Sequence, residues 1–248
     1  MDRNRVSRRR VLAGMVAAPL LSGVAKPAAA AEADGASARP IIRAAVLRHP
    51  QLVPSTVRDL DATYARNAKG MIAEIDKAMA AAGRKPRLFV FPVLQIHSAG
   101  PRGSSGVPIE AVAVDLVSKP LAEGVFAPIV AICKRHDCYV VTTTIEKTPR
   151  LPGLYFHTGL IIGPEGLVLR SPKAQAYSTS DITPLREIVD EYANAFGEAA
   201  ILPVAKTPIG TLGCFVEKEG EVLEAARLLV SKGAEIIVQP SAERDDVP

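Results

Sequence analysis

The residues best suited to chemistry lie where a glycine-rich strand meets a helix. Residues 207–216 form an apolar, strand-like run, and Glu217-Lys218-Glu219 follows before a helical pattern begins. Carboxylates can act as nucleophiles or general bases in hydrolysis, and so can the thiol of Cys214. On a continuous strand, the three-residue offset puts Cys214 and Glu217 on opposite faces. We therefore expect Glu217 rather than Cys214 at any site here, unless a register shift reverses the two.

The other cysteines and the histidines carry weaker signals. Three cysteines are too few for a disulfide framework, and we favour free thiols over a Cys133–Cys138 bond. The four histidines, which are His49, His97, His136 and His157, lack metal-ligand spacing. We interpret them as structural or surface residues, and we expect neither a metal nor a cofactor.

The elements that would position these residues alternate between strands and helices. Apolar runs predict strands over residues 41–47, 87–92, 138–145 and 234–238 and a hairpin over residues 154–170. Apolar residues at three- and four-residue spacing predict helices over residues 59–82 and 121–136, and another after Glu221. Residues 178–199 are acidic and partly helical in pattern. The alternation predicts a layered α/β domain.

The glycine-rich segment resembles the nucleophile segment of the nitrilase (carbon-nitrogen hydrolase) superfamily. There, a strand ends in Cys-Tyr-Glu or Cys-Tyr-Asp, and a helix and a Gly-Ala strand follow, as Gly233-Ala234 does here. The resemblance covers about residues 41–242 and is best over 88–92, 154–173 and 210–241. It implies a four-layer α-β-β-α sandwich, here C-terminally incomplete because the family's last strands and helix have no counterpart.

The resemblance also implies where catalytic groups would lie. The family hydrolyses amides or nitriles with a cysteine nucleophile, a glutamate base, a lysine that stabilises the developing oxyanion and a second glutamate that orients this lysine. Glu217 occupies the cysteine position and Val93 the base position. Lys173 keeps the lysine, Glu146 the second glutamate, and Glu219 the acid two residues after the nucleophile.

Three functions fit these substitutions. The first is a family member that has lost thiol-dependent hydrolysis but keeps its fold and a pocket for a small amide or nitrile. The second is a working periplasmic amidase or nitrilase that uses Glu217, Lys173 and Glu146 in altered chemistry. The third is a structural or assembly partner of an active paralogue. Any of them is compatible with a homo-oligomer.

The N-terminal residues resemble an export signal peptide. Arg8-Arg9 precedes an apolar run and an alanine-rich stretch, the layout of a twin-arginine (Tat) signal. We therefore expect a signal peptide at 1–31, a linker at 32–40 and a truncated hydrolase domain at 41–248, located in the periplasm or secreted. Beyond residue 31, 24 basic and 25 acidic residues remain, so the basic balance of the whole chain does not indicate nucleic-acid binding. After cleavage we expect no membrane association.

Replacing both Arg8 and Arg9 with lysine should retain the precursor in the cytoplasm, because twin-arginine export depends on this pair. Fractionation followed by immunoblotting measures the outcome. Export of the double variant at the parent's level would contradict the signal assignment.

Overall fold

The computed structural model describes residues 41–81, 83, 85–97, 107–175 and 182–241. The expected signal and linker lie outside these residues, and every described element belongs to the unit Pro40–Pro248. None of the helices in this part of the chain combines the length and apolarity of a membrane span.

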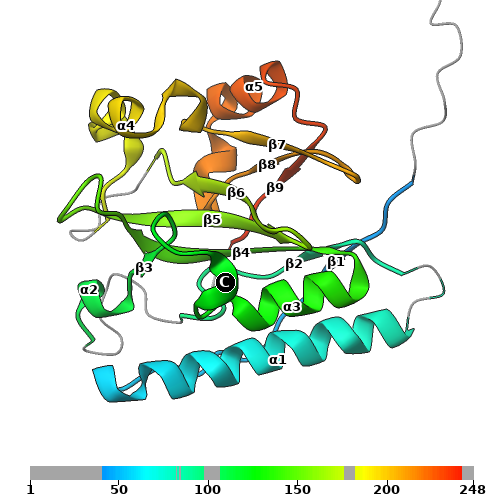
Figure 1. The fold of residues 1–248 in the computed structure, drawn as a ribbon. Helices are drawn as coiled ribbons and strands as arrows, with labels where there is room; N and C mark the ends of the chain where they lie inside the picture. The colour runs from blue at the N-terminus through cyan, green and yellow to red at the C-terminus, as the bar shows by residue number, and fades with distance from the viewer. Residues whose placement is uncertain (1–40, 82, 84, 98–106, 176–181, 242–248) are drawn as a thin grey trace, which may run out of the picture. The chain divides into compact units, whose positions relative to one another are not determined.

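A six-stranded sheet forms the centre of the described unit (Figure 1). Its strands are β1 (Ala44–Val46), β2 (Leu88–Val90), β3 (Val114–Asp115), β4 (Tyr139–Lys147), β5 (Tyr155–Gly163) and β6 (Gly166–Pro172). β1, β2 and β4 run parallel, whereas β4, β5 and β6 are antiparallel neighbours, and β3 pairs with β4. The structure confirms the predicted strands and the β5–β6 hairpin.

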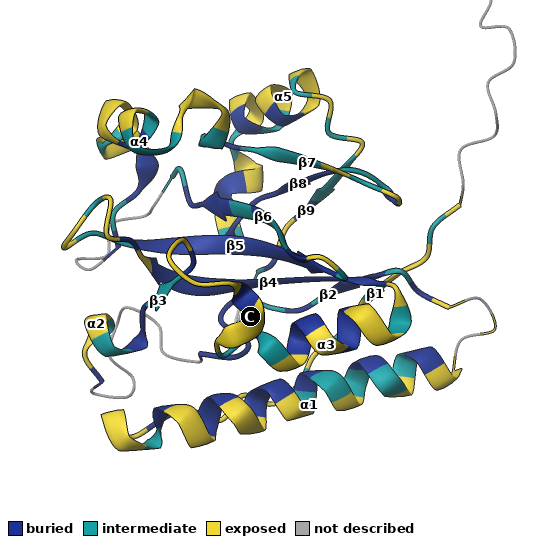
Figure 2. Ribbon diagram, viewed as in Figure 1, coloured by how far each residue is buried: buried dark blue, intermediate teal, exposed yellow. Residues whose placement is uncertain are grey.

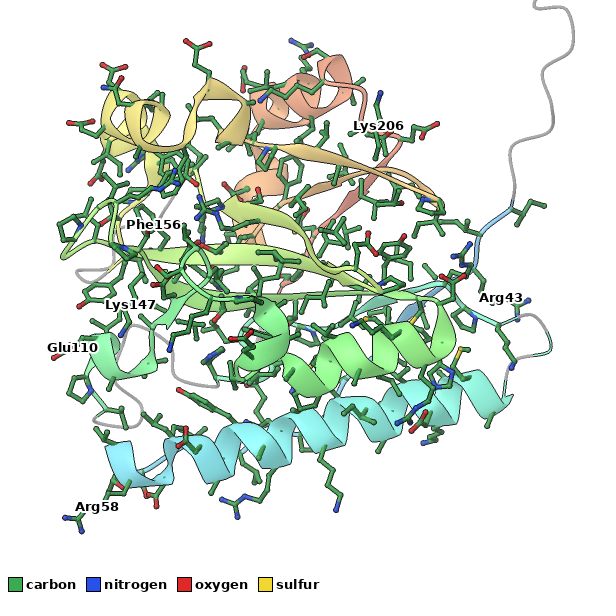
Figure 3. The ribbon with its side chains drawn as sticks, viewed as in Figure 1. Arg43, Arg58, Glu110, Lys147, Phe156 and Lys206 are labelled. Carbon is green, nitrogen blue, oxygen red and sulfur yellow. The ribbon has the colours of Figure 1, made fainter. Side chains whose placement is uncertain are left out.

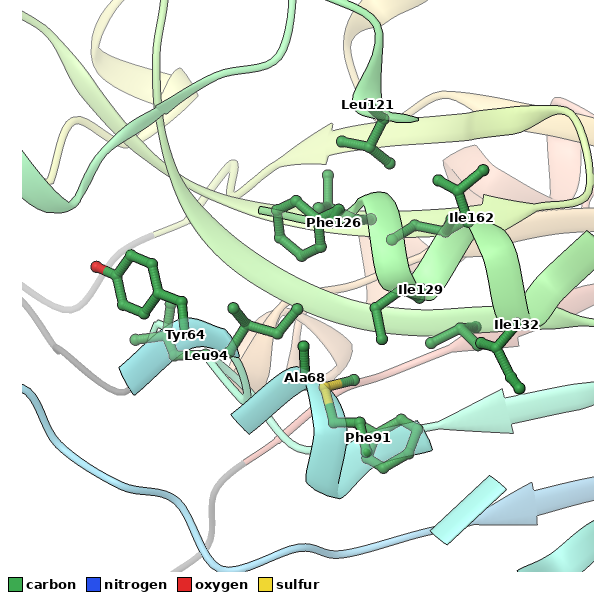
Figure 4. Close-up of a cluster of buried hydrophobic side chains, with 14 of the residues drawn as sticks. Tyr64, Ala68, Phe91, Leu94, Leu121, Phe126, Ile129, Ile132 and Ile162 are labelled. Carbon is green, nitrogen blue, oxygen red and sulfur yellow. The ribbon is translucent and has the colours of Figure 1, made fainter. Parts of the chain in front are cut away.

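Two helices cover one face of this sheet. α1 (Leu60–Ala81) buries residues at the predicted spacing, including Tyr64, Ala68 and Met71, beside α3 (Ala127–His136) (Figure 4). The prediction of one helix over residues 121–136 is wrong. A 3-10 turn, η2 (Leu121–Glu123), ends at Gly124, whose extended backbone breaks the run, and α3 then starts with Pro128 in its first turn. A short helix, α2 (Ile109–Val112), precedes β3.

A second sheet contains three strands, β7 (Val204–Thr207), β8 (Gly210–Cys214) and β9 (Ile236–Val238). β7 and β8 form a hairpin, and β9 returns parallel to β8 through the short turn η5 (Glu217–Glu221) and the helix α5 (Leu223–Ser231). β7, which is only four residues long, was not predicted from the sequence. Upstream lies α4 (Val189–Phe196), flanked by the turns η3 (Leu185–Glu187) and η4 (Glu198–Ala200).

Apolar residues from both sheets form a shared core. Leu88, Tyr139 and Val141 of the large sheet pack with Leu212 and Cys214 of the small one. The outer face of the small sheet packs against α5 through a separate cluster (Figure 2). The order helix, sheet, sheet, helix confirms the predicted four-layer arrangement. On β5, Phe156 meets Tyr192 of α4 edge to face, with ring centroids 5.9 Å apart (Figure 3).

Candidate functional site

The ends of two strands, one from each sheet, bring Lys173 and Glu217 together. Lys173 directly follows β6, and its backbone N–H donates to the carbonyl of His157 at 2.8 Å. Glu217 begins η5 after β8, and its N–H donates to the carbonyl of Pro240 at 2.9 Å. Glu217 has a φ of 54°, a left-handed conformation that non-glycine residues adopt at a cost. The chain therefore turns sharply at the residue that carries the carboxylate.

An ion pair joins the two side chains. Nζ of Lys173 donates a close hydrogen bond to Oε2 of Glu217. The lysine side chain is 8% exposed and that of Glu217 is 36% exposed. Burial raises the pKa of Glu217, but His157 and the hydrogen bond and charge of Lys173 outweigh it, so the pKa falls below its ordinary value. Glu217 is thus held as a carboxylate, and it compensates the buried ammonium.

His157 completes the site and was missed by the sequence analysis. Its Nε2 lies 2.8 Å from Oγ1 of Thr143, and its Nδ1 lies 3.8 Å from Oε2 of Glu217. From the sequence, His157 was interpreted only as a structural or surface residue. Burial lowers the pKa of His157 to about 4, so the ring is neutral at pH 7.

The hydrogen bonds around Thr143 assign the tautomer of this histidine. Oγ1 of Thr143 already accepts the N–H of Leu94 at 2.8 Å. Thr143 is fully buried, so its own hydroxyl hydrogen needs an acceptor, and Nε2 of His157 is within reach. We therefore assign the ring hydrogen to Nδ1, which faces Glu217.

Glu146 lies with Arg170 rather than with Lys173, which corrects the expectation that Glu146 orients this lysine. Its Oε1 accepts from Nη1 of Arg170 and its Oε2 accepts from Oγ1 of Thr158, both at 2.7 Å. Glu146 pairs with Phe156 across β4 and β5, so its side chain lies on the same face of the sheet as that of Thr158. Side chains alternate along each strand, so the side chain of His157 points to the opposite face. Burial raises the pKa of Glu146 despite the charge of Arg170.

Glu219 is the second carboxylate at this strand junction. Its Oε2 accepts the N–H of Val216 at 2.7 Å, and its Oε1 accepts the N–H groups of Ala174 and Gln175. The side chain therefore ties the start of η5 to the segment after β6. Burial raises the pKa of Glu219, and the backbone donors oppose that rise. Glu219 fixes the relative positions of the segments that carry Lys173 and Glu217.

Val93 and Cys214 offer no reactive group to the site. Val93 is 7% exposed, has an apolar side chain, and contributes its backbone carbonyl to Nε2 of Gln51 at 3.1 Å. Cys214 is fully buried between the sheets, and a Cβ on Gly159 would lie 2.7 Å from its Sγ. Burial raises the pKa of the Cys214 thiol far above neutrality. Cys133 and Cys138 are likewise free and buried.

The described residues contain no group of three or more His, Cys, Asp or Glu side chains arranged to hold a metal ion. The site consists instead of a cation, a carboxylate and a neutral imidazole.

Comparison with known proteins identifies the family. A carbon-nitrogen hydrolase family model matches residues 43–248, so the chain belongs to the carbon-nitrogen hydrolase family. A comparison with curated proteins finds no match.

Solved structures share the fold at low sequence identity. Nit3 of Saccharomyces cerevisiae, from branch 10 of the nitrilase superfamily, is 16% identical with a TM-score of 0.63 and aligns over 82% of this chain and 65% of its own. A carbon-nitrogen hydrolase from Helicobacter pylori G27 is 18% identical with a TM-score of 0.52, covering 82% and 60% of the two chains. A mutant amidase from Nesterenkonia sp. AN1, with an acetamide moiety added at its active site cysteine, is 17% identical with a TM-score of 0.53, covering 83% and 66%. The chain therefore spans less than two thirds of the length of these neighbours.

The contribution of His157 to the stability of the protein should fall as the pH drops from about 6.5 to about 4. The pKa of His157 is lowered from 6.5 to about 4, so its contribution is complete above pH 6.5. It is lost as the pH falls toward 4, because the unfolded chain takes up a proton that the folded protein does not yet bind. The expected loss is on the order of 3 kcal/mol. Urea unfolding at several pH values measures it.

His157→Asn should remove most of this loss, whereas His136→Asn should not reduce it. Nε2 of His136 pairs with Asp76 at 2.8 Å on the other side of the large sheet, so it serves as the matched control. An identical pH dependence in the parent and in His157→Asn would contradict the assignment.

Proposed function

We propose that this chain is a carbon-nitrogen hydrolase family protein that has lost thiol-dependent hydrolysis of amides and nitriles. The observation that carries the proposal is the Lys173–Glu217 pair at the position that the resemblance assigns to the nucleophile. A carboxylate in contact with the ammonium neutralises the cation that would otherwise stabilise an oxyanion. The protein would keep the fold and a small polar pocket for an amide or nitrile ligand.

The protonation states of the site also favour the loss of hydrolysis. A general acid or base works best when its pKa lies near the operating pH. The pKa of His157 is about 4, and that of Glu217 is below its ordinary value. Val93 has no proton to exchange at the base position. None of these three residues is therefore tuned to transfer protons at neutral pH.

The Nesterenkonia amidase illustrates the chemistry that we propose is lost. Its solved structure carries a covalent adduct at an active site cysteine. The three cysteines of the present chain are all fully buried. A thioester at position 217 is impossible because a glutamate stands there.

A second candidate function is hydrolysis with altered chemistry. The left-handed backbone of Glu217 favours this alternative, because such strain is found mostly at functional sites. In this case Glu217 would activate a water molecule, with Lys173 beside it. Glu146 would have no part in the reaction because it is bound to Arg170.

We also propose that the protein acts outside the cytoplasm. The support is the twin-arginine pattern at Arg8-Arg9, with the apolar and alanine-rich run behind it.

The purified protein should hydrolyse simple amides and nitriles no faster than background, and iodoacetamide should not modify it while it is folded. All three thiols are fully buried, so alkylation requires unfolding. Ammonia release and intact-mass spectrometry measure the two outcomes. In denaturant, all three thiols should react.

The variant Glu217→Cys should gain one rapid adduct, because a thiolate there would be stabilised by the Lys173 ammonium. Val216→Cys is the matched control, since position 216 is fully buried and a thiol there should not react quickly. Parent hydrolysis that disappears in both Glu217→Gln and Lys173→Ala would establish the altered-hydrolase alternative. Hydrolysis that survives both variants would place an active site elsewhere.

A further inference from the structure

An open groove lies along the edge strand β6, away from the Lys173–Glu217 pair. Its volume is about 350 Å³, and Val117, Leu167 and Leu169 supply apolar wall. Two arginines, Arg150 and Arg170, and the aromatic ring of Phe196 also line the groove. This volume falls at the small end of the range for ligand pockets, which is ~300–1,000 Å³.

Both arginines of the groove pack on one aromatic ring. The guanidinium carbon of Arg150 lies 5.1 Å from the ring centroid of Phe196, and that of Arg170 lies 4.3 Å from it. Such contacts favour a cation over the ring face. Both guanidinium groups therefore lie against the ring of Phe196 in the same groove. They differ in whether a carboxylate compensates their charge.

Arg170 is already neutralised. Its Nη1 donates to the buried carboxylate of Glu146 at 2.7 Å, and its Nη2 donates to the hydroxyl of Tyr192. An anionic ligand would gain little from the charge of Arg170, because that charge is already compensated by the carboxylate of Glu146. Arg170 instead forms a fixed wall that keeps Phe196 in place.

Arg150 is the cation that lacks an anion. Its Nη1 donates to the carbonyl of Ala195 at 2.8 Å, and its second contact is the ring of Phe196. No carboxylate among the described residues forms an ion pair with it, and the residue is exposed. The remaining N–H groups of this guanidinium have the geometry that recognises a carboxylate through two hydrogen bonds.

We propose that this groove binds a small organic monocarboxylate with an apolar body. The carboxylate would pair with Arg150, and the body would lie on Val117, Leu167 and Leu169. A ligand cation would be repelled by Arg150, and an inorganic anion would leave the apolar wall unused. This site is separate from the proposed ligand pocket at Lys173 and does not depend on it.

Titration calorimetry with benzoate and hexanoate tests the proposal, with benzyl alcohol and 1-hexanol as neutral counterparts. Both acids should bind saturably and more tightly than the alcohols. Arg150→Gln should weaken the acids by about tenfold or more, as expected for a hydrogen bond to a charged group. Val117→Asp should weaken them as well, because it adds a negative charge to the groove.

Two control variants should bind the acids like the parent. Arg58→Gln removes an exposed arginine in the turn before α1 (Figure 3). Lys173→Met removes the cation of the other site. Thermal unfolding shows that each variant is folded. The proposal is overturned if neither acid binds saturably, if the alcohols bind as tightly, or if Arg150→Gln binds the acids like the parent.

Discussion

The ion pair between Lys173 and Glu217 is the interaction on which the rest of the site depends. A buried ammonium is costly without a partner, and Glu217 supplies that partner from the other sheet. The contact requires the ends of β6 and β8 to lie together, which Glu219 secures through backbone N–H groups on both segments. The hydroxyl of Ser171 adds a second link, donating to the carbonyl of Cys214 at 3.0 Å. The strained backbone of Glu217 is tolerated within this framework.

This pair explains how the proposed loss of a thiol would leave a coherent site rather than a defect. A glutamate in place of a nucleophilic cysteine would be an isolated buried charge if no cation stood beside it. Lys173 removes that problem, and the neutral ring of His157 directs its Nδ1 hydrogen toward the same carboxylate. Valine at position 93 is suited to a buried position without a charge partner. The substitutions are therefore mutually compatible, which supports the proposal that they are features of a folded protein.

Local patterns in the sequence predicted much of the fold. The spacing of apolar residues in α1 predicted a helix that the structure shows over Leu60–Ala81, and apolar runs predicted the β5–β6 hairpin. Patterns failed where backbone geometry overrides side-chain periodicity. Gly124 interrupts the apolar run before α3, and β7 includes Lys206 and Thr207, so it forms no continuous apolar run.

The site was less predictable because it depends on which face of a strand each side chain occupies. The sequence placed Lys173 and Glu217 at strand ends through the family resemblance, and the structure brings them into contact. Glu146 was expected beside Lys173, but its strand pairing turns it toward Arg170. His157 carried no spacing signal because its partner Thr143 lies on a neighbouring strand. Contacts between strands depend on register, because a slip of one residue moves every side chain of a strand to the other face of the sheet.

The ionisation of Glu217 tests the central claim most directly. Carbon-13 NMR of the labelled side-chain carboxyl, assigned with Glu217→Gln, reports its pKa in the folded protein. The account predicts a pKa below the ordinary value of 4.5 in the parent and a higher pKa in Lys173→Met. A parent pKa at or above 4.5, or one that does not change in Lys173→Met, would contradict the pairing of Lys173 with Glu217 and the account built on it.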